Sequence, residues 1–363
     1  MKKIKNSTML RRMKGVFLSA AVCLSSETAI TAIPVNAAET GTDNSMYQLA
    51  DSCQEGTILH CFCWSYHDVT ASMRQIASAG FTSVQLSPAQ PNPYGVTGIC
   101  WNVAYQPIDF CLDEYNYIEE DLRELCKEAD KYGIKVIMDV VANHLVYVDG
   151  LTPDEYARND HWHNAGKITD YSNRSNITGG DLSELRDLNT ENKSVQNSVK
   201  KYINQLYDAG VDGMRWDAAK HIGLPSEGSD FWPSVLDSRL YNYGEIIGGP
   251  VDTDEKYDLM KEYTSLMSVT DNNYGEELVN SFNQGKAPDT ESNWLSEGIS
   301  SDRLVFWGES HDTYSNGPDK SGATTMMTQN TIDKAYAVAA AREGATSTVQ
   351  NTLMVRFMTG NIG

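Results

Sequence analysis

The chain has 363 residues, which is enough for one large domain with an insertion. Its 49 acidic and 29 basic side chains give a formal net charge of −20 at pH 7. Such a charge argues against nucleic acid and anionic membranes as partners, and it suits a soluble secreted protein with a neutral substrate.

The first predicted element is an export signal over residues 1–38. Six basic side chains open it, an apolar stretch runs from Gly15 to Leu24, and Val35–Ala38 offers small residues for cleavage. The apolar stretch is too short to span a bilayer. We therefore expect a secreted, extracellular chain that starts near Glu39; a disordered or uncleaved N-terminal tail is the alternative.

Seven cysteines are present, and one of them lies in the predicted signal. The others are Cys53, Cys61, Cys63, Cys100, Cys111 and Cys126. Export permits disulfides, but the sequence leaves their pairing open. Cys61 and Cys63 alternate across a predicted strand and so cannot bond to each other. No Cys-x2-Cys pair exists, so we do not expect a zinc site.

Short apolar runs alternate with helical stretches, which is the pattern of a parallel β/α fold. Seven strands are predicted, at 57–62, 83–87, 135–141, 213–216, around 243–244, 265–269 and 304–307. Helices are predicted at 69–79, 119–132, 194–208 and 332–342. Between Leu145 and Asn192 the chain is polar and irregular, and so long a stretch inside a compact domain is usually functional or a small subdomain.

Three carboxylates stand at or just past the ends of apolar runs: Asp217, Glu245 and Asp312. Cleavage of a glycosidic bond needs two carboxyl groups that flank one sugar bond, and a β/α barrel collects such residues at the C-terminal ends of its strands. Arg215 lies two residues before Asp217 on the same strand face, where it would keep Asp217 ionised. The alternatives are a structural ion pair for Asp217, an exposed loop position for Glu245 and a helix N-cap for Asp312.

Two further groups of residues suggest binding. Asn143 and Asp187 carry the oxygen ligands that calcium takes, although each could be a hydrogen-bonded turn residue instead. Trp101, Tyr105 and Gln106 could form an aromatic floor for a sugar ring, with core packing as the alternative.

Taken together, these segments resemble the α-amylase family of glycoside hydrolases, in its secreted bacterial form. The segments that carry the resemblance are 139–144, 185–192, 213–221, 244–247 and 309–314, and the likeness runs from about Gly56 to Ser347. The resemblance implies a (β/α)8 barrel, an inserted domain after the third strand and a C-terminal β-sandwich. It also implies retaining endo-hydrolysis of α-1,4-glucosidic bonds in starch and related glucans.

The resemblance implies a role for each matching residue. Asp217 would be the nucleophile, Glu245 the general acid/base and Asp312 a stabiliser of the transition state. Arg215 would orient Asp217. Tyr105, His144 and His311 would bind substrate at the subsite of the cleaved sugar. Lys220 and His221 would bind it on the leaving-group side. Calcium would be held by the side chains of Asn143 and Asp187 and the carbonyls of Thr178 and His221.

The expected domains are a discontinuous barrel over 39–144 and 200–350, a calcium-side insert over 145–199 and an atypical tail over 351–363. After Ser347 the chain departs from the family's aromatic-rich eighth strand, so we expect the eighth strand and the sandwich to be truncated or absent, as a frameshifted or shortened coding sequence would leave them. The segment Leu353–Met358 is apolar and β-prone and could still fill the gap.

Two residues differ from those that are common at the matching positions of the family. Asn102 stands where relatives often carry an aromatic residue beside Trp101, and Ser310 replaces the commoner Asn before His311, which argues against an animal-type chloride site. We expect a monomer that acts on α-glucans. The alternatives are an α-glucan transglycosylase on the same barrel and an inactive, truncated glucan-binding remnant.

Overall fold

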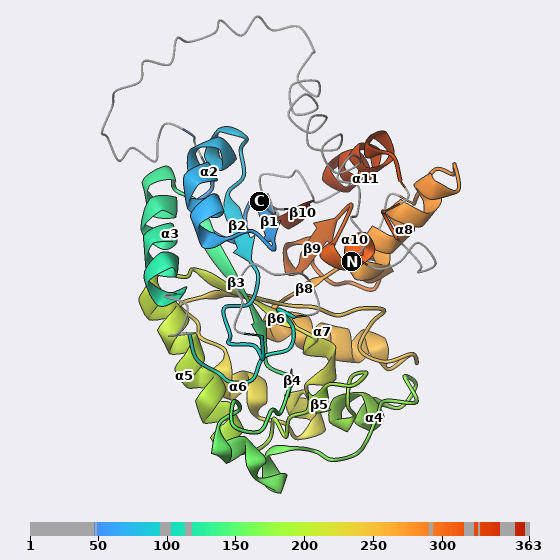
Figure 1. Ribbon diagram of the computed structural model, residues 1–363. Coiled ribbons are helices and arrows are strands. Elements are labelled where there is room, and N and C mark those ends of the chain that lie inside the picture. Colours follow the sequence, from blue (N-terminus) through green and yellow to red (C-terminus); the bar gives the residue numbers. More distant parts are fainter. Residues whose placement is uncertain are drawn as a thin grey trace, which may run out of the picture.

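Eight parallel strands close into a barrel in the computed structural model (Figure 1). The model describes residues 47, 49–94, 103–112, 118–289, 293–315, 323–325, 327–341 and 353–359. Around the barrel the strands are β1 (Thr57–Phe62), β2 (Ser83–Leu86), β3 (Lys135–Val141), β6 (Gly213–Asp217), β7 (Tyr241–Gly244), β8 (Ser268–Thr270), β9 (Leu304–Trp307) and β10 (Leu353–Thr359). The predicted (β/α)8 fold is confirmed.

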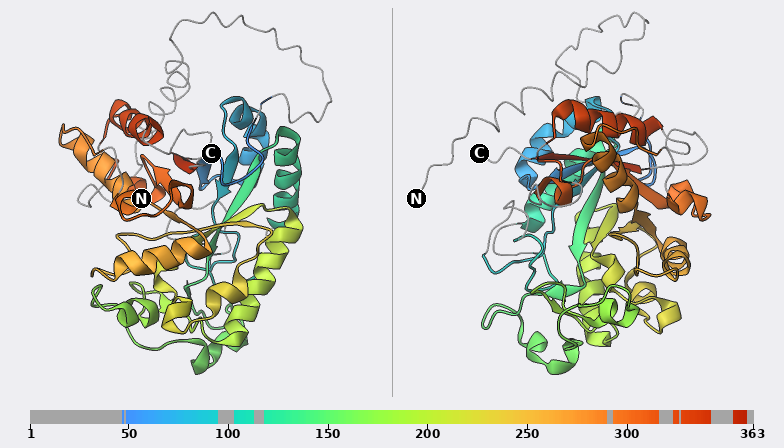
Figure 2. Two further views of the ribbon diagram at one scale, coloured as in Figure 1. Left: turned by 180° about the vertical axis from the view of Figure 1, so that it is seen from behind. Right: turned by 90° about the vertical axis from the view of Figure 1, so that its right-hand side faces the viewer.

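Helices cover the outside of the barrel, as the two views of Figure 2 show. They are α2 (Tyr66–Ser78), α3 (Ile118–Tyr132), α5 (Lys193–Ala209), α6 (Phe231–Val235), α7 (Lys256–Leu266), α8 (Asn272–Asn283), α9 (Asn293–Ser296) and α11 (Gln329–Ala341). The short helix α10 (His311–Ser315) instead follows the C-terminal end of β9. Local chemistry sets their ends. Ser65 caps α2 by accepting a hydrogen bond from the N–H of Asp68, and Gly210 ends α5 in the left-handed conformation. The four helices predicted from periodicity are present, with ends within three residues of those observed.

The sixth barrel strand lies later in the chain than predicted. The predicted strand covers 265–269, but α7 continues to Leu266 and β8 covers only Ser268–Thr270. Leu259, Tyr263 and Leu266 recur at helical spacing and pack in the core, so the apolar run begins as a helix face. The prediction therefore assigned the end of a helix to the strand.

The eighth strand is present, which corrects the expectation that it is missing. β10 pairs in parallel with β1 from Thr57↔Met354 to Phe62↔Thr359, and with β9 from Leu353↔Val305 to Val355↔Trp307. The alternative in which Leu353–Met358 fills the gap is the one observed. A short apolar, β-prone segment suffices because β1 and β9 each offer an unpaired edge.

The insert after β3 lies at the C-terminal ends of the barrel strands (Figure 1, green). It holds β4 (His144–Leu145), β5 (Arg186–Asp187), α4 (Arg174–Gly179) and two short 3-10 helices at Asp154–Ala157 and Asn159–His161. β4 and β5 pair antiparallel, with His144 opposite Asp187. The predicted boundary at residue 199 stays a prediction, and α5 runs through that point.

Two expectations concern the export of the chain. The predicted signal, residues 1–38, lies outside the described residues. No helix in the described part of the chain is both long and apolar enough to cross a membrane. Cys53, Cys61 and Cys126 are free thiols, Cys63 and Cys111 lie within the described residues, and Cys100 lies outside them.

Candidate active site

A buried arginine gathers three carboxylates at the C-terminal ends of the barrel strands. Arg215 Nη1 donates to Asp139 Oδ1 at 2.8 Å and to Asp217 Oδ1 at 2.7 Å, and its Nη2 donates to Glu245 Oε1. The hydroxyl of Tyr105 donates to Asp139 Oδ2 at 2.6 Å. We call Arg215, Asp139, Asp217 and Glu245 the Arg215 cluster.

Strand register explains why these side chains meet. Arg215 is paired with Asp139 of β3 on one side and with Tyr243 of β7 on the other. Alternate residues of a strand point to the same face, so Arg215 and Asp217 both face the barrel axis. Glu245 follows Gly244, where an added Cβ would lie only 2.8 Å from the Cβ of Ala219. A glycine is therefore needed where β7 leads into the site.

Burial dominates the electrostatics of the two predicted catalytic carboxylates. It raises the pKa of Asp217 and that of Glu245 to about 7, although the Arg215 guanidinium works in the opposite direction for both. Each is raised further by carboxylates nearby, Asp139 and Asp312 for Asp217, and Asp217 and Asp312 for Glu245. The Arg215 guanidinium thus favours the ionised form of Asp217, while desolvation opposes it and has the larger effect.

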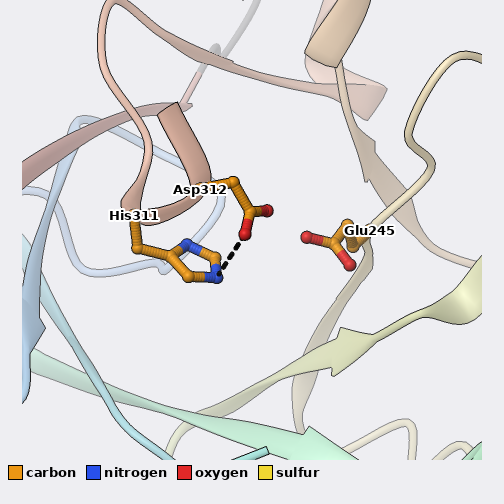
Figure 3. Close-up of side chains that lie close together, drawn as sticks. All are labelled: Glu245, His311 and Asp312. Carbon is orange, nitrogen blue, oxygen red and sulfur yellow. Dashed lines mark ion pairs between the residues drawn. The ribbon is translucent and has the colours of Figure 1, made fainter. Parts of the chain in front are cut away.

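The third predicted carboxylate faces Glu245 from the opposite wall of the site. Figure 3 shows Asp312 and His311 on α10, with the Asp312 carboxylate directed toward Glu245. His311 Nε2 lies 3.8 Å from Asp312 Oδ1, and one ligand atom from each of Glu245, His311 and Asp312 lies within 4.8 Å of the others. The His311 ring stacks on Tyr105 at 5.5 Å between centroids. The three predicted catalytic carboxylates thus surround one space.

The remaining predicted residues at the cleaved-sugar subsite are brought together in part. His144 Nε2 donates to the carbonyl of Tyr105 at 3.1 Å, and burial lowers the pKa of His144 to about 4, so the ring is neutral. Gln106 follows Tyr105 and is half-buried, with its N–H bonded to the carbonyl of Val103. Trp101 lies outside the described residues.

Lys220 and His221 lie together on a short 3-10 helix after β6. Lys220 Nζ donates to the carbonyl of Ile247 at 2.6 Å and lies 5.1 Å from the ring centroid of Tyr171. Tyr171 and Ile247 are both 39% exposed. Tyr171 could not be picked out from the sequence, because nothing in a polar insert marks one tyrosine out before the fold places it beside Lys220.

The predicted cation ligands present oxygens that lack partners. His144 donates a hydrogen bond through Nε2, so its Nδ1 is free to accept one. Asn143 Nδ2 lies 3.5 Å from this Nδ1. The amide oxygen of Asn143, Oδ1, therefore points away from the His144 ring. Asn143 Oδ1 and Asp187 Oδ1 are buried and, among the described residues, have no hydrogen-bond partner. A hard cation takes oxygen ligands of these two kinds.

One hydrogen bond from a side chain to the backbone joins the segments that carry the other two predicted cation ligands. His221 Nδ1 donates to the carbonyl of Ile177 at 3.1 Å, which ties the segment of Thr178 to that of His221. Burial raises the pKa of Asp187 to about 7, and the hydrogen bond from His163 works in the opposite direction. The residues present therefore fit calcium.

Comparison with known proteins identifies the family. The family model of the α-amylase catalytic domain matches residues 170–355, which is half of the chain. The chain belongs to the α-amylase family.

Individual relatives agree with that assignment. An α-amylase of Clostridium acetobutylicum is 31% identical over 338 residues, and one of Butyrivibrio fibrisolvens is 29% identical over 353 residues. These alignments cover 87% and 84% of this chain but only 42% and 35% of those proteins, so the chain spans less than half the length of either relative. The crystal structure of α-amylase I from Eisenia fetida has a TM-score of 0.65 at 22% identity, over 83% of this chain and 66% of that one, and supports the fold.

Proposed function

We propose that this chain carries a retaining glycoside-hydrolase site for α-1,4-linked glucans. The observation that supports it best is that Asp217 and Glu245 are bonded to the same guanidinium of Arg215. Two carboxylates that share one guanidinium are close neighbours. Retaining enzymes need the shorter separation of about 5–5.5 Å, whereas inverting enzymes leave about 6.5–9.5 Å for a water molecule.

In the first step Glu245 acts as an acid and Asp217 as a nucleophile. Glu245 gives its proton to the glycosidic oxygen while Asp217 attacks the anomeric carbon, so that the bond to the leaving sugar breaks and a glycosyl ester of Asp217 forms. The raised pKa of Glu245 favours a protonated acid near neutral pH. Arg215 stabilises the charge on Asp217 until it attacks.

In the second step Glu245 acts as a base. It removes a proton from water, the hydroxide attacks the anomeric carbon, and the ester bond to Asp217 breaks with restoration of its carboxylate. Asp312, which faces Glu245 across the site, stabilises the positive charge that develops on the sugar ring in both steps. Two inversions at one carbon give net retention.

The polar and aromatic groups around the cluster suit a sugar chain. On one side the stacked rings of Tyr105 and His311 offer a flat apolar face beside the Arg215 cluster. On the other side Tyr171 and Lys220 hold an exposed ring and an ammonium group where a leaving sugar would lie. The substrate that we propose is therefore an α-glucan with sugar units on both sides of the cleaved bond.

We also propose that calcium binds beside this site, through the side chains of Asn143 and Asp187 and the carbonyls of Thr178 and His221. Bound calcium supplies a positive charge that ties the insert to the barrel. The support is the pair of partnerless oxygens on Asn143 and Asp187. Secretion and a monomeric state stay predictions from the sequence.

The deciding experiment is the release of reducing sugar from soluble starch by the purified chain, with Asp217→Asn, Glu245→Gln and Asp312→Asn beside it. We expect wild-type activity and a loss of about 10²–10⁴-fold in kcat for Glu245→Gln, since general acid catalysis contributes that much. Asp160→Asn is the matched control, because its side chain is 55% exposed and remote from the cluster contacts.

The outcomes separate the alternatives. Proton NMR of the first product should show the α-anomer, as retention requires, and the β-anomer would contradict the double displacement. Longer or cyclic products in place of short maltooligosaccharides would indicate a transglycosylase. A wild-type chain that is folded by circular dichroism yet releases no sugar would identify an inactive remnant.

A further inference from the structure

One histidine links a proposed calcium ligand to a second carboxylate. His163 Nδ1 donates to Asp187 Oδ2, and His163 Nε2 donates to Glu191 Oε2 at 2.7 Å. Both ring nitrogens are therefore used on carboxylates. The two oxygens of Asp187 therefore differ. Oδ2 is bound to the imidazole, and Oδ1 is buried and has no partner among the described residues.

The backbone holds this histidine in place independently of its side chain. Trp162 forms an isolated bridge with Leu188, and the N–H of His163 bonds to the carbonyl of Asp187. The N–H of Asn189 bonds to the carbonyl of His161 on the same ladder. A substitution at His163 should therefore remove the side-chain contacts and leave the local fold intact.

We propose that His163, supported by Glu191, is a positioning residue that orients the Asp187 carboxylate for calcium. This inference rests on the calcium site proposed above. The imidazole holds Oδ2 and leaves Oδ1, the oxygen without a partner among the described residues, for the ion. Glu191 holds the far side of the ring and fixes the direction of its Nδ1–H bond.

The energetic reason is the burial of Asp187, whose side chain is 1% exposed. Without His163, Oδ2 would lose its donor in a place that water reaches poorly, and an unsatisfied buried acceptor is costly. Groups that orient metal ligands from behind typically change metal affinity by about 10–100-fold when they are removed. The same range is expected here.

The test is isothermal titration of calcium into the chelator-stripped chain, for the wild type, His163→Ala, His163→Asn and Glu191→Ala. His163→Ala should bind calcium about 10–100-fold more weakly. His163→Asn should lose much less, because its amide N–H can replace Nδ1–H. The matched controls are His67→Ala and Glu184→Ala, whose side chains are 90% and 83% exposed; they should bind as the wild type does.

A second measurement separates positioning from general stability. The melting temperature of each variant is measured in chelator and in saturating calcium, because a ligand that binds only the folded state stabilises it according to its affinity. His163→Ala should melt close to the wild type in chelator and show a smaller rise with calcium. Equal losses in both conditions would mean a structural role and would overturn the proposal, as would unchanged calcium affinity.

Calcium binding by the wild-type chain distinguishes a failure of the proposed calcium site from a failure of the inference about His163. If the wild-type chain binds no calcium, the proposed calcium site fails and the role of His163 falls with it. If the wild type binds calcium and His163→Ala binds it equally well, the site stands and the inference about His163 is wrong.

Discussion

Arg215 brings one positive charge to three carboxylates in a place that solvent barely reaches. Its own exposed fraction is 2%, and those of Asp217 and Glu245 are 8% and 7%. A single guanidinium cannot balance three negative charges, so protons are held more tightly than usual, which is what the raised pKa values of Asp217 and Glu245 express. The cluster is thereby prepared to hold a proton near neutral pH.

This arrangement predicts a bell-shaped pH dependence of kcat/KM. Catalysis needs Asp217 ionised and Glu245 protonated, and an interacting pair loses its two protons in separate steps. Activity should fall above about pH 7 as Glu245 loses its proton, and fall again in acid as Asp217 gains one. Initial rates on a short maltooligosaccharide across the acid to alkaline range provide the measurement.

The control for assigning the alkaline limb to Glu245 is the pH dependence of the residual activity of the Asp312→Asn variant. The charge of Asp312 raises the pKa of Glu245, so removing it should move the alkaline limb to lower pH. A rate that stays flat well into the alkaline range would show that Glu245 is not the acid.

At this scale the sequence predicted the three carboxylates of the proposed site and Arg215 beside Asp217, but not the full set of contacts that holds them. Asp217, Glu245 and Asp312 follow short apolar runs, and that position alone suggests a barrel rim. Asp139 also ends such a run, yet its bonds to Arg215 and Tyr105 come from the register between β3 and β6. Such contacts depend on register and loop path, which a residue's own neighbours in sequence do not reveal.

At the scale of elements, α4 is attached to the barrel side by the buried side chain of Arg174. Its guanidinium donates to both oxygens of Glu227, at 2.8 and 2.9 Å, and to Tyr263 Oη at 2.8 Å. It also donates to the carbonyls of Lys220 and Ile222, on either side of His221. One side chain thus positions the segment that carries Lys220 and His221.

Arg174→Met should therefore destabilise the chain by roughly 3 kcal/mol, the low end for breaking a buried ion pair, because Glu227 keeps some solvent contact. Urea unfolding with linear extrapolation is the measurement. Arg158→Ala is the comparison: its ion pair with Asp160 is exposed, so its loss should destabilise the chain far less than Arg174→Met. Equal losses for the two variants would show that Arg174 does not hold α4.

Elements whose pattern is purely local were predicted well, and those at a change of pattern were not. The helices α3 and α5 repeat apolar residues over several turns, so their periodicity defines them. The run that ends α7 and begins β8 mixes apolar residues with Ser265 and Ser268, and only the packing of Leu266 against the core shows where the helix stops.

At the scale of the whole molecule, β10 joins the two ends of the barrel sheet. Deleting residues 353–363 would leave β1 and β9 with unpaired edges, which favour pairing between molecules. We expect the shortened chain to elute as oligomers in size-exclusion chromatography and to melt at a lower temperature.

Deletion of residues 360–363 alone is the matched control for this prediction, because it keeps β10 and should leave elution and melting unchanged. A monomeric 1–352 chain with the melting temperature of the full chain would mean that closure by β10 contributes nothing. The sequence could name the segment that closes the barrel, but only the pairing with both neighbours shows that it does.

Asn143 and His144, neighbours in sequence, lie at the junction of the two proposed sites. Asn143 offers its oxygen to the cation, while His144 bonds to Tyr105, whose hydroxyl bonds to Asp139 of the Arg215 cluster. If binding at the two sites is coupled along this path, the coupling is reciprocal. Any factor by which calcium raises the affinity for a transition-state-like sugar is then also the factor by which that sugar raises the affinity for calcium. The ion would act as an effector of sugar binding as well as a structural support.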